Sequence, residues 1–415
     1  MLSMLNALTP NQRNAAIASY FSWTLDAFDF FILVFVLKDV AQEFGTDVAW
    51  VSVAITLTLA ARPLGALLFG LAADRYGRKS TLIIDILLFS ASGFVSGLAP
   101  NFFIFVIIRL IFGVAMGGAW GVGAALAMET IAARARGAAS GILQAGYPSG
   151  YLLAAMTYFA LFGLIGWRGM FMVGIIPGLL LVWYIWREVR ESPAFLSRAA
   201  RYAGISFLQP IAVLWAHRRL FLYAVALMTA FNFLSHGTQD LYPTFLQVQR
   251  GFSPHRVGVI AIIYNIGAII GGLLFGALSQ HLGRRRAIVI ASLLVLPIIV
   301  PWGYGPGPWT LAAGAFLIQF AVQGAWGIVP AHLNELSPGT VGGTFPGFVY
   351  QLGNLLASPN APIQARIAEA YGGNYAFALA IVTTIAALLL AALAYFAPQV
   401  HGVAFDPNDV AHKGD

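Results

Sequence analysis

The sequence predicts an all-α membrane protein in which twelve transmembrane helices form two bundles of six. Three observations support this prediction. Of the 415 residues, 59% are hydrophobic and only 9% are charged; long apolar runs recur along the chain; and the second half repeats the first. A soluble domain has about 45–50% apolar and about 25% charged residues. The composition therefore excludes a soluble globular domain and a disordered chain, and the lack of cysteine excludes a disulfide scaffold.

The apolar runs can supply twelve crossings of a bilayer. Each crossing takes ~20 apolar residues, so twelve need about 240, which is nearly the whole apolar content of the chain. Glycine, proline and charged residues divide the runs into helices at 17–37, 50–73, 81–98, 102–128, 138–163, 169–186, 220–246, 257–280, 287–303, 309–333, 342–363 and 374–396. The longest polar interruption, 187–219, separates six helices from six. We therefore expect a first bundle over 1–190, a linker over 191–218 and a second bundle over 219–415.

The basic residues predict the orientation in the membrane. With the first residue on the cytoplasmic side, sixteen Lys and Arg residues fall on that side and five on the other. This asymmetry follows the positive-inside rule and predicts an inner or plasma membrane protein with both termini in the cytoplasm. The polar start, residues 1–14, lacks the apolar core of a removable signal peptide. Because the basic residues lie in short loops, they indicate topology, and no nucleic acid partner is expected.

The two halves are related by one constant offset of 206 residues. The segment 65–70 (GALLFG) aligns with 271–276 (GGLLFG), and Glu129 aligns with Glu335 at the same offset. An offset that persists through four helices indicates a parallel duplication of a six-helix unit. Such duplications are typical of transporters whose substrate site lies near the membrane midplane between the halves.

Two segments carry a resemblance to a known family. Residues 70–79 (GLAADRYGRK) resemble the signature between the second and third helices of the major facilitator superfamily, and 109–117 (RLIFGVAMG) resembles its fourth-helix motif. A degenerate copy of the first signature lies at 276–286, with Gln280 where the first copy has Asp74. The resemblance implies a monomer that works by alternating access of two bundles, without a cofactor or covalent chemistry.

The first predicted helix contains two carboxylates, Asp26 and Asp29, which share one face at a spacing of three residues. Charged residues inside a membrane helix are costly and are therefore functional candidates. Burial and mutual proximity favour the protonated form of such groups, which suits a proton carrier. The alternative is that each carboxylate forms an ion pair with an arginine, Arg62 or Arg109.

The predicted helix 220–246 carries four polar residues on one stripe. Asn232, His236, Gln239 and Asp240 stand at positions i, i+4, i+7 and i+8 in otherwise apolar sequence. A single histidine in such a helix is usually structural, but four aligned polar side chains favour the lining of a cavity.

This stripe also carries a narrower resemblance. Residues 232–244 match the Asn-x-x-(Ser/Thr)-His-x-(Ser/Thr)-Gln-Asp-x-x-x-Thr signature of yeast Jen-type lactate and pyruvate permeases, and 23–29 resembles the wider sialate:proton symporter group. The resemblance implies that the four stripe residues take part in carboxylate recognition and proton coupling. We expect the His236–Asp240 pair to carry the proton, with either aspartate of the first helix as the alternative.

A carboxylate substrate also needs a cation. Arg62 lies in the middle of its predicted helix, and its planar guanidinium matches a carboxylate. We favour Arg62 over Arg109, which is expected to pair with an aspartate of the first helix.

Further polar residues are expected near the substrate. Gln351 and Asn354 lie one turn apart, as a Gln and an Asn do in Jen-type permeases, and Tyr147 lies in a glycine-rich helix beside the expected cavity. Gln319 and Gln323 form a stripe that predicts hydrogen bonds between helices.

Charged residues at the expected cytoplasmic helix ends predict a network that closes the protein on that side. The network and its associated motif residues are Asp74, Arg75, Arg78, Arg109, Glu129, Arg134, Arg136 and Glu335. The alternative for any single arginine is a simple topology signal.

Together these observations predict a proton-coupled symporter of small monocarboxylates, lactate or pyruvate, whose partners are the substrate, protons and the lipid bilayer. The alternatives are a sialic acid or aromatic acid symporter of the same group, and a membrane sensor built on a transporter fold. No phosphate-binding loop, metal-ligand spacing or nucleophile elbow is present in the sequence, so no enzyme activity, metal or cofactor is expected.

Overall fold

The computed structural model describes residues 8–199 and 207–397, and within these ranges all regular structure is helical. The predicted positions of both chain termini fall on residues outside this part. The predicted linker contributes two short helices, α8 (Pro193–Ala199) and α9 (Gln209–Ala216), and its residues 200–206 also lie outside the described ranges.

The first half contains the first six predicted crossings. Its helices are α2 (Pro10–Glu43), α3 (Val48–Tyr76), α4 (Arg78–Ser96), α5 (Phe102–Thr130), α6 (Arg136–Val173) and α7 (Ile175–Glu188). The fifth and sixth crossings run into each other because α6 continues through Gly166, whose φ of 61° turns the chain between them. A short 3-10 turn, η1 (Ala133–Ala135), precedes α6.

The second half contains the other six crossings, several of them broken. Its elements are α10 (Arg218–Gln239), α11 (Tyr242–Thr244), η2 (Phe245–Gln249), α12 (Pro254–Leu282), α13 (Arg284–Tyr304), α14 (Pro308–Trp326), α15 (Val329–Leu336), α16 (Phe345–Ala357), α17 (Asn360–Ala370) and α18 (Tyr375–Tyr395). By length and composition, ten helical stretches of the described chain can span a membrane. The difference from twelve arises because 133–188 counts as one stretch and because α16 and α17 are each too short to count.

Side-chain caps explain several helix starts. Thr9 begins α2 with a capping box, and the side chains of Asn101, Ser253 and Asn374 accept a hydrogen bond from a backbone N–H in the first turn of α5, α12 and α18. These bonds satisfy backbone donors that a helix start leaves without partners.

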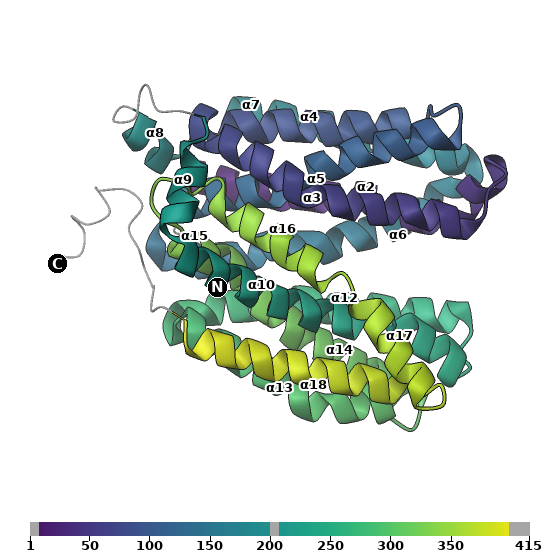
Figure 1. Cartoon of the computed structure of the whole chain (residues 1–415). Coiled ribbons are helices and arrows are strands. Elements are labelled where there is room, and N and C mark those ends of the chain that lie inside the picture. The colour runs from purple at the N-terminus through teal and green to yellow at the C-terminus, as the bar shows by residue number, and fades with distance from the viewer. Residues whose placement is uncertain (1–7, 200–206, 398–415) are drawn as a thin grey trace.

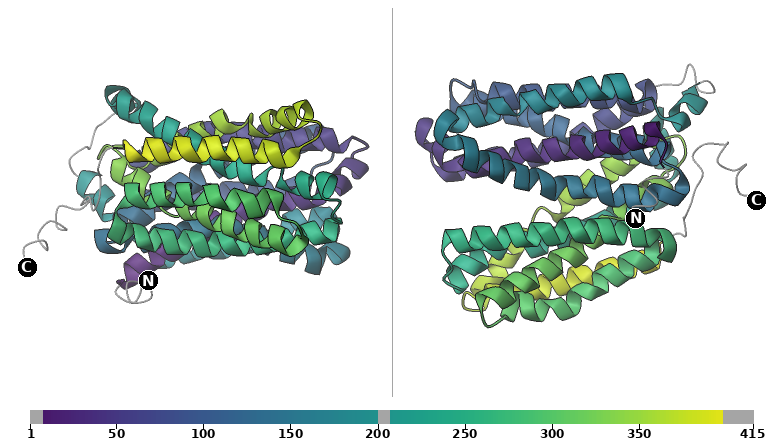
Figure 2. Two further views of the ribbon diagram at one scale, coloured as in Figure 1. Left: turned by 90° about the horizontal axis from the view of Figure 1, so that it is seen from below. Right: turned by 180° about the vertical axis from the view of Figure 1, so that it is seen from behind.

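The helices form two groups that lie side by side along their length (Figure 1), and the view from behind shows the same division (Figure 2). The groups touch where α6 packs on α12 and where α16 packs on α3. Both contacts use small residues: Gly141 lies against the backbone of Gly272, and Gly347 lies near Ala66. Such residues let membrane helices approach closely.

One end of the molecule gathers the buried ion pairs. We call it the charged end and define it by Asp74, Arg78, Glu129, Arg284 and Glu335. In each half the chain turns there through a glycine with positive φ, Gly77 at 100° and Gly283 at 84°. These glycines occupy equivalent positions in the two halves, so the duplication extends to the backbone conformation.

Candidate functional site: a central cavity and the charged end

A cavity of about 380 Å³ lies between the two halves. Helices α2, α3 and α6 form one wall, and α10, α12, α14 and α16 form the other. The residues that line it are Trp23, Phe30, Phe31, Val34, Leu59, Arg62, Gln144, Tyr147, Pro148, Tyr151, Asn232, Ser235, His236, Gln239, Asp240, Tyr264, Asn265, Ala268, Gln319, Gln323, Trp326, Tyr350 and Asn354. The wall from the first half is rich in aromatic residues, whereas the other is rich in amides.

Arg62 provides a cation on the aromatic wall. Its side chain is 3% exposed, and its guanidinium carbon lies 5.9 Å from the ring centroid of Trp23 and 5.8 Å from that of Tyr350. Aromatic faces attract a cation without consuming its hydrogen-bond donors. Nε and Nη2 of Arg62 have no hydrogen-bond partner among the described residues. The guanidinium of this cavity-lining residue therefore has two buried donors that no described residue compensates.

On the opposite wall, His236 connects α10 to α16 through a hydrogen bond. Its Nδ1 lies 3.1 Å from Oδ1 of Asp240, and its Nε2 lies 2.9 Å from Oδ1 of Asn354 on α16. Both nitrogens face oxygen acceptors, an arrangement that suits a doubly protonated ring. The structure thus brings the predicted His236–Asp240 pair together with Asn354, which sequence reasoning selected separately.

The remaining stripe residues are held by amide hydrogen bonds. The Asn232 amide donates to the carbonyl of Met228 at 2.8 Å, and the Gln239 amide donates to Oε1 of Gln319 at 2.9 Å. Gln319 in turn donates to the Thr238 hydroxyl at 3.0 Å. Gln319 therefore joins α14 to α10, as the sequence predicted, and it lines the cavity as well.

Tyr147 lies in the cavity wall, and its ring centroid is 5.2 Å from that of Trp23. Gln351 departs from the expectation: it is buried, is not among the lining residues, and neither its side-chain oxygen nor its nitrogen has a hydrogen-bond partner among the described residues. The cavity face of α16 passes through Tyr350 and Asn354, four residues apart, and a residue one position after Tyr350 is rotated by about 100° from it.

The two aspartates of the first helix do not line the cavity. Asp26 and Asp29 are buried inside the first half, and both carboxylate oxygens of Asp26 have no hydrogen-bond partner among the described residues. Arg109 lies within electrostatic reach of both. Its three side-chain nitrogens also have no hydrogen-bond partner in the described chain, and its guanidinium carbon is 3.9 Å from the centroid of Phe112. The hydrogen-bonded ion pair considered for these residues is therefore not formed.

Arg109 also lies away from the charge network to which the sequence analysis assigned it. It is completely buried on α5, twenty residues before Glu129. At 1.5 Å per residue this separation is about 30 Å along the helix axis. Arg109 therefore belongs to the interior of the first half and not to the network at the charged end.

Sequence reasoning missed Asp85. It lies on α4, is 0% exposed, and neither of its carboxylate oxygens has a hydrogen-bond partner among the described residues. The rule that selected Asp26, a charge inside an apolar run, applies equally to Asp85 in the predicted helix 81–98 and could have found it.

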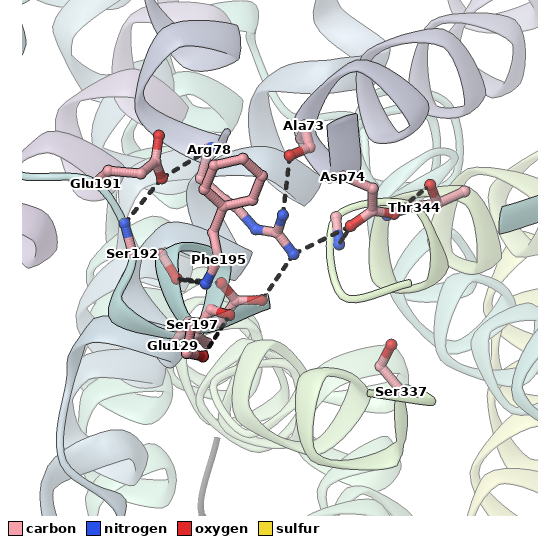
Figure 3. Close-up of polar contacts among 12 residues, drawn as sticks. Ala73, Asp74, Arg78, Glu129, Glu191, Ser192, Phe195, Ser197, Ser337 and Thr344 are labelled. Carbon is pink, nitrogen blue, oxygen red and sulfur yellow. Dashed lines mark hydrogen bonds and ion pairs between the residues drawn. The ribbon is translucent and has the colours of Figure 1, made fainter. Parts of the chain in front are cut away.

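At the charged end, Asp74 links the two halves (Figure 3). Its carboxylate accepts from the backbone N–H groups of Gly343 at 2.7 Å and Thr344 at 3.0 Å, and from the Thr344 hydroxyl at 2.7 Å. Arg78 donates to Asp74 at 3.0 Å and to Glu129 at 2.9 Å. These bonds form the core of the predicted network.

The segment before α8 completes this cluster, which the sequence did not indicate. The Glu191 carboxylate accepts from the backbone N–H groups of Arg78 at 2.9 Å and Lys79 at 3.0 Å, at the start of α4. The Ser192 hydroxyl donates to Glu129, and the Phe195 ring lies 5.4 Å from the guanidinium carbon of Arg78 (Figure 3). A carboxylate at a helix N-terminus satisfies backbone donors and interacts favourably with the helix dipole.

The other predicted network residues separate into two kinds. Glu335 accepts from Arg284 at 3.0 Å, in a completely buried pair. Arg136 donates its Nε to the carbonyls of Met128 at 2.8 Å and Ile131 at 3.2 Å, so it caps the end of α5. Arg75 and Arg134 are exposed.

Comparison with known proteins places these features in a family. The sequence profile described as Major Facilitator Superfamily matches residues 19–358 and, in a second match, 241–414. The carboxylic acid transporter protein homolog of Saccharomyces cerevisiae is 30% identical over 391 residues, covering 88% of this chain and 63% of that protein. The chain thus spans less than two thirds of the length of that relative.

Two further proteins are similar over nearly their whole length. The sialic acid transporter NanX of Escherichia coli is 24% identical over 404 residues, covering 94% of this chain and 96% of that protein. The solved structure of the proton:xylose symporter XylE aligns with a TM-score of 0.78 at 19% identity, covering 96% of this chain and 99% of that chain.

These findings confirm the resemblance that residues 70–79 and 109–117 indicated, and with it the twelve-helix architecture. The chain is a multi-pass membrane transporter rather than an enzyme, and it belongs to the major facilitator superfamily.

Proposed function

We propose that this transporter carries small monocarboxylates, lactate or pyruvate, together with protons. The observation that carries the proposal is Arg62, a buried guanidinium that faces the cavity and has two nitrogens without hydrogen-bond partners in the described chain. A carboxylate that binds it bidentately would satisfy both donors. The relative from yeast, named as a carboxylic acid transporter homolog, supports the same class of substrate.

The opposite wall suits the rest of such a substrate. His236 and Asn354 line the wall that the second half contributes, and their contact at 2.9 Å leaves the amide nitrogen of Asn354 to donate to a hydroxyl or keto group next to the carboxylate. Tyr147 and Trp23 cover the apolar part of a small acid. A volume of about 380 Å³ lies toward the lower end of the range of small-molecule sites, ~300–1,000 Å³.

We assign the proton to the His236–Asp240 pair. The two side chains are 3.1 Å apart in the cavity wall, so a proton taken up there interacts directly with a bound anion. Histidine titrates near physiological pH, which suits a carrier that must load and release within one cycle. Asp26 or Asp29 is the alternative carrier, through its electrostatic interaction with Arg62 or Arg109.

We further propose that the charged end faces the cytoplasm of an inner or plasma membrane. The excess of basic residues on this side agrees with the positive-inside rule. Asp74 and Gln280 both connect the two halves there, so the conformation described is one in which the cytoplasmic side is closed.

A second candidate is symport of a larger organic acid, such as sialic acid. The amides of the second half favour it, because Asn232, Gln239 and Asn265 could accept or donate hydrogen bonds to several hydroxyls. The relative NanX, named as a sialic acid transporter, supports this possibility.

Counterflow in proteoliposomes tests the proposal and separates the candidates. Vesicles loaded with unlabelled lactate, pyruvate, sialic acid or benzoate are diluted into the labelled compound. We expect lactate and pyruvate to exchange and Arg62→Lys to reduce the exchange, because lysine keeps the charge but loses the planar fork. Arg134→Lys, at an exposed position, is the matched control. Exchange of sialic acid alone would replace the monocarboxylate assignment with the second candidate, and exchange of none would refute both.

A further inference from the structure

A second hollow lies in the second half, at the end of the molecule opposite the charged end. Its volume is about 320 Å³, and residues from the beginnings of α12 and α14 line it. Among them are Arg256, Val259 and Ile263 of α12 and Trp309 and Ala312 of α14. None of the residues that line this hollow also lines the central cavity. We call it the outer groove.

The outer groove faces away from the central cavity. Val259 and Ile263 each lie five residues before a residue of the cavity wall, Tyr264 and Ala268, and five residues turn an α-helix by about 140°. Val259 is 40% exposed, and Ile270, about three turns further along the same side of α12, is 45% exposed. In a multi-pass membrane protein, exposed apolar residues on the outside of a bundle contact lipid acyl chains.

The groove crosses the boundary between the headgroups and the acyl chains. α12 has 29 residues and is about 44 Å long, close to the thickness of a bilayer with its headgroups, about 40–45 Å. Its last turn leads to Gly283 at the charged end, so Arg256 in its first turn lies among the headgroups of the opposite leaflet. Val259 and Ile263 lie about 5–10 Å deeper. Trp309, the second residue of α14, is 80% exposed, as is typical of aromatic residues at a membrane interface.

The mouth of the groove is basic. His255 and Arg256 line it, and Arg250 lies in the loop before α12. The positive-inside rule disfavours basic residues at this end of the molecule, yet these three fall within seven residues. No Asp or Glu occurs between Asp240 and Glu335, so neither helix of the groove, nor the loop before it, supplies a counter-charge. Basic pockets between membrane helices bind anionic headgroups.

Local contacts hold the basic mouth in place. The guanidinium carbon of Arg256 lies 5.1 Å from the ring centroid of Phe252, a contact that leaves the guanidinium N–H groups for an anion such as phosphate. Arg250 donates to the carbonyl of Gly305 at 2.7 Å, which joins the loop before α12 to the loop before α14. The two loops at the mouth are therefore fixed to each other.

We propose that the outer groove binds one anionic phospholipid from the leaflet opposite the charged end. The lipid phosphate lies at His255 and Arg256, and one acyl chain lies along Val259, Ile263 and Ala312. A zwitterionic lipid can cover the same apolar surface, but its headgroup carries a cation that the basic mouth repels, so the groove selects for net negative charge. The proposal does not depend on which substrate the transporter carries.

Photo-crosslinking of the full chain in lipid nanodiscs tests the proposal. The discs contain phosphatidylcholine and a trace of phosphatidylglycerol with a diazirine in one acyl chain. We expect crosslinks in 254–263 and 308–312 that unlabelled phosphatidylglycerol suppresses and that added phosphatidylcholine or soluble glycerol phosphate does not. Suppression by soluble glycerol phosphate would show a site for free anions, and equal crosslinking by a phosphatidylcholine probe would show an unselective surface. Either result would overturn the proposal.

Two kinds of variant separate the headgroup contact from the acyl-chain contact. Arg256→Gln should lower crosslinking in these segments about fivefold, the effect of one basic residue on an anionic lipid, whereas Arg256→Lys should keep most of it. Val259→Trp, at an exposed position, keeps the charges but fills the groove, and it should lower crosslinking as well.

Two controls accompany these variants. Arg366→Gln, at an exposed position on α17, removes a different arginine and should leave crosslinking in the groove unchanged. Crosslinks around Leu388 of α18, which is 49% exposed, report a folded chain in lipid and should be the same in every variant. Crosslinking in the groove at the level of the parent, in Arg256→Gln or in Val259→Trp, would overturn the proposal.

Discussion

The contacts that close the charged end occur twice, and the two copies differ in charge. Asp74 accepts from Gly343 and Thr344, and 206 residues later Gln280 accepts from Gly137 at 3.1 Å. Gly137 and Gly343 are themselves equivalent positions, so each half offers the start of a helix to the same loop of the other half. A carboxylate at a helix N-terminus is held more strongly than a neutral amide. The duplication has kept the geometry and placed the charge in one copy.

The interiors of the halves differ in the same way. The first half buries Asp26, Asp85, Arg62 and Arg109, whereas the polar residues that the second half contributes to the cavity are mainly amides and the His236–Asp240 pair. This difference suggests a division of labour. If the proposed function holds, the first half holds the fixed charges that attract an anion, and the second half positions the substrate and exchanges a proton.

The largest effect is expected from Asp240→Asn, which removes the carboxylate of the second half. Uptake driven by a pH gradient should fall to background, because the carrier can no longer load its proton beside the substrate. Exchange of substrate against substrate should persist, since exchange need not return an empty carrier. Labelled-lactate uptake with and without a pH gradient measures both quantities. Normal accumulation in this variant would move the proton site to the first half.

Removal of the fixed cation should have the next largest effect. Arg62→Ala should weaken lactate binding about a hundredfold, or about 3 kcal/mol, because a buried anion loses its charge-assisted hydrogen bonds. Arg62→Lys should cost about tenfold, since the charge remains. Isothermal calorimetry in detergent measures both affinities. Binding by both variants at the affinity of the parent would mean that the division of labour is wrong.

Removal of the Asp74 contact should destabilise the closed state more than removal of the Gln280 contact. Asp74→Asn loses a charged acceptor and should destabilise the closed state by about 2 kcal/mol, whereas Gln280→Ala should cost about 1 kcal/mol. Because the chain has no natural cysteine, Ala268→Cys in the cavity wall provides a single site for a thiol reagent. Labelling from the charged end should accelerate about thirtyfold and about fivefold respectively. Equal acceleration of labelling in the two variants would show that the two closing contacts do not differ in strength.

The smallest effect should come from adding charge to the weaker contact. Gln280→Glu places a carboxylate opposite the N–H of Gly137, beside Arg284, which already donates to Gln280 at 3.2 Å. We expect labelling at Ala268→Cys to slow by about threefold, a gain of about 0.7 kcal/mol. Faster labelling would show that the longer side chain disturbs the contact more than its charge stabilises it.

Much of the fold could be predicted because each membrane helix is marked in the sequence by a long apolar run. An apolar run of sufficient length has few alternatives in a bilayer, and the constant offset identified the duplication. The broken crossings, such as α16 and α17, were predicted as single helices, because a break at Ser358 and Pro359 leaves the apolar pattern intact.

Some residues of the candidate site could be predicted from the sequence and others could not, and the reasons are physical. Four polar residues on one stripe of α10 all line the cavity, because a polar stripe in an apolar helix has few other places to face. Gln351 was misplaced because a spacing of three residues leaves the direction of a side chain uncertain by a large part of a turn. Glu191 could not be foreseen, since its contact with the start of α4 depends on where the linker folds back.

Simultaneous recording of substrate and proton movement tests the central claim most directly. Proteoliposomes with an internal pH indicator receive radiolabelled lactate at equal pH on both sides and zero membrane potential. We predict that lactate entry acidifies the interior beyond the diffusion background, that an outwardly acidic gradient drives accumulation, and that Asp240→Asn abolishes both effects. Lactate entry without acidification, or acidification that persists in Asp240→Asn, would contradict the account.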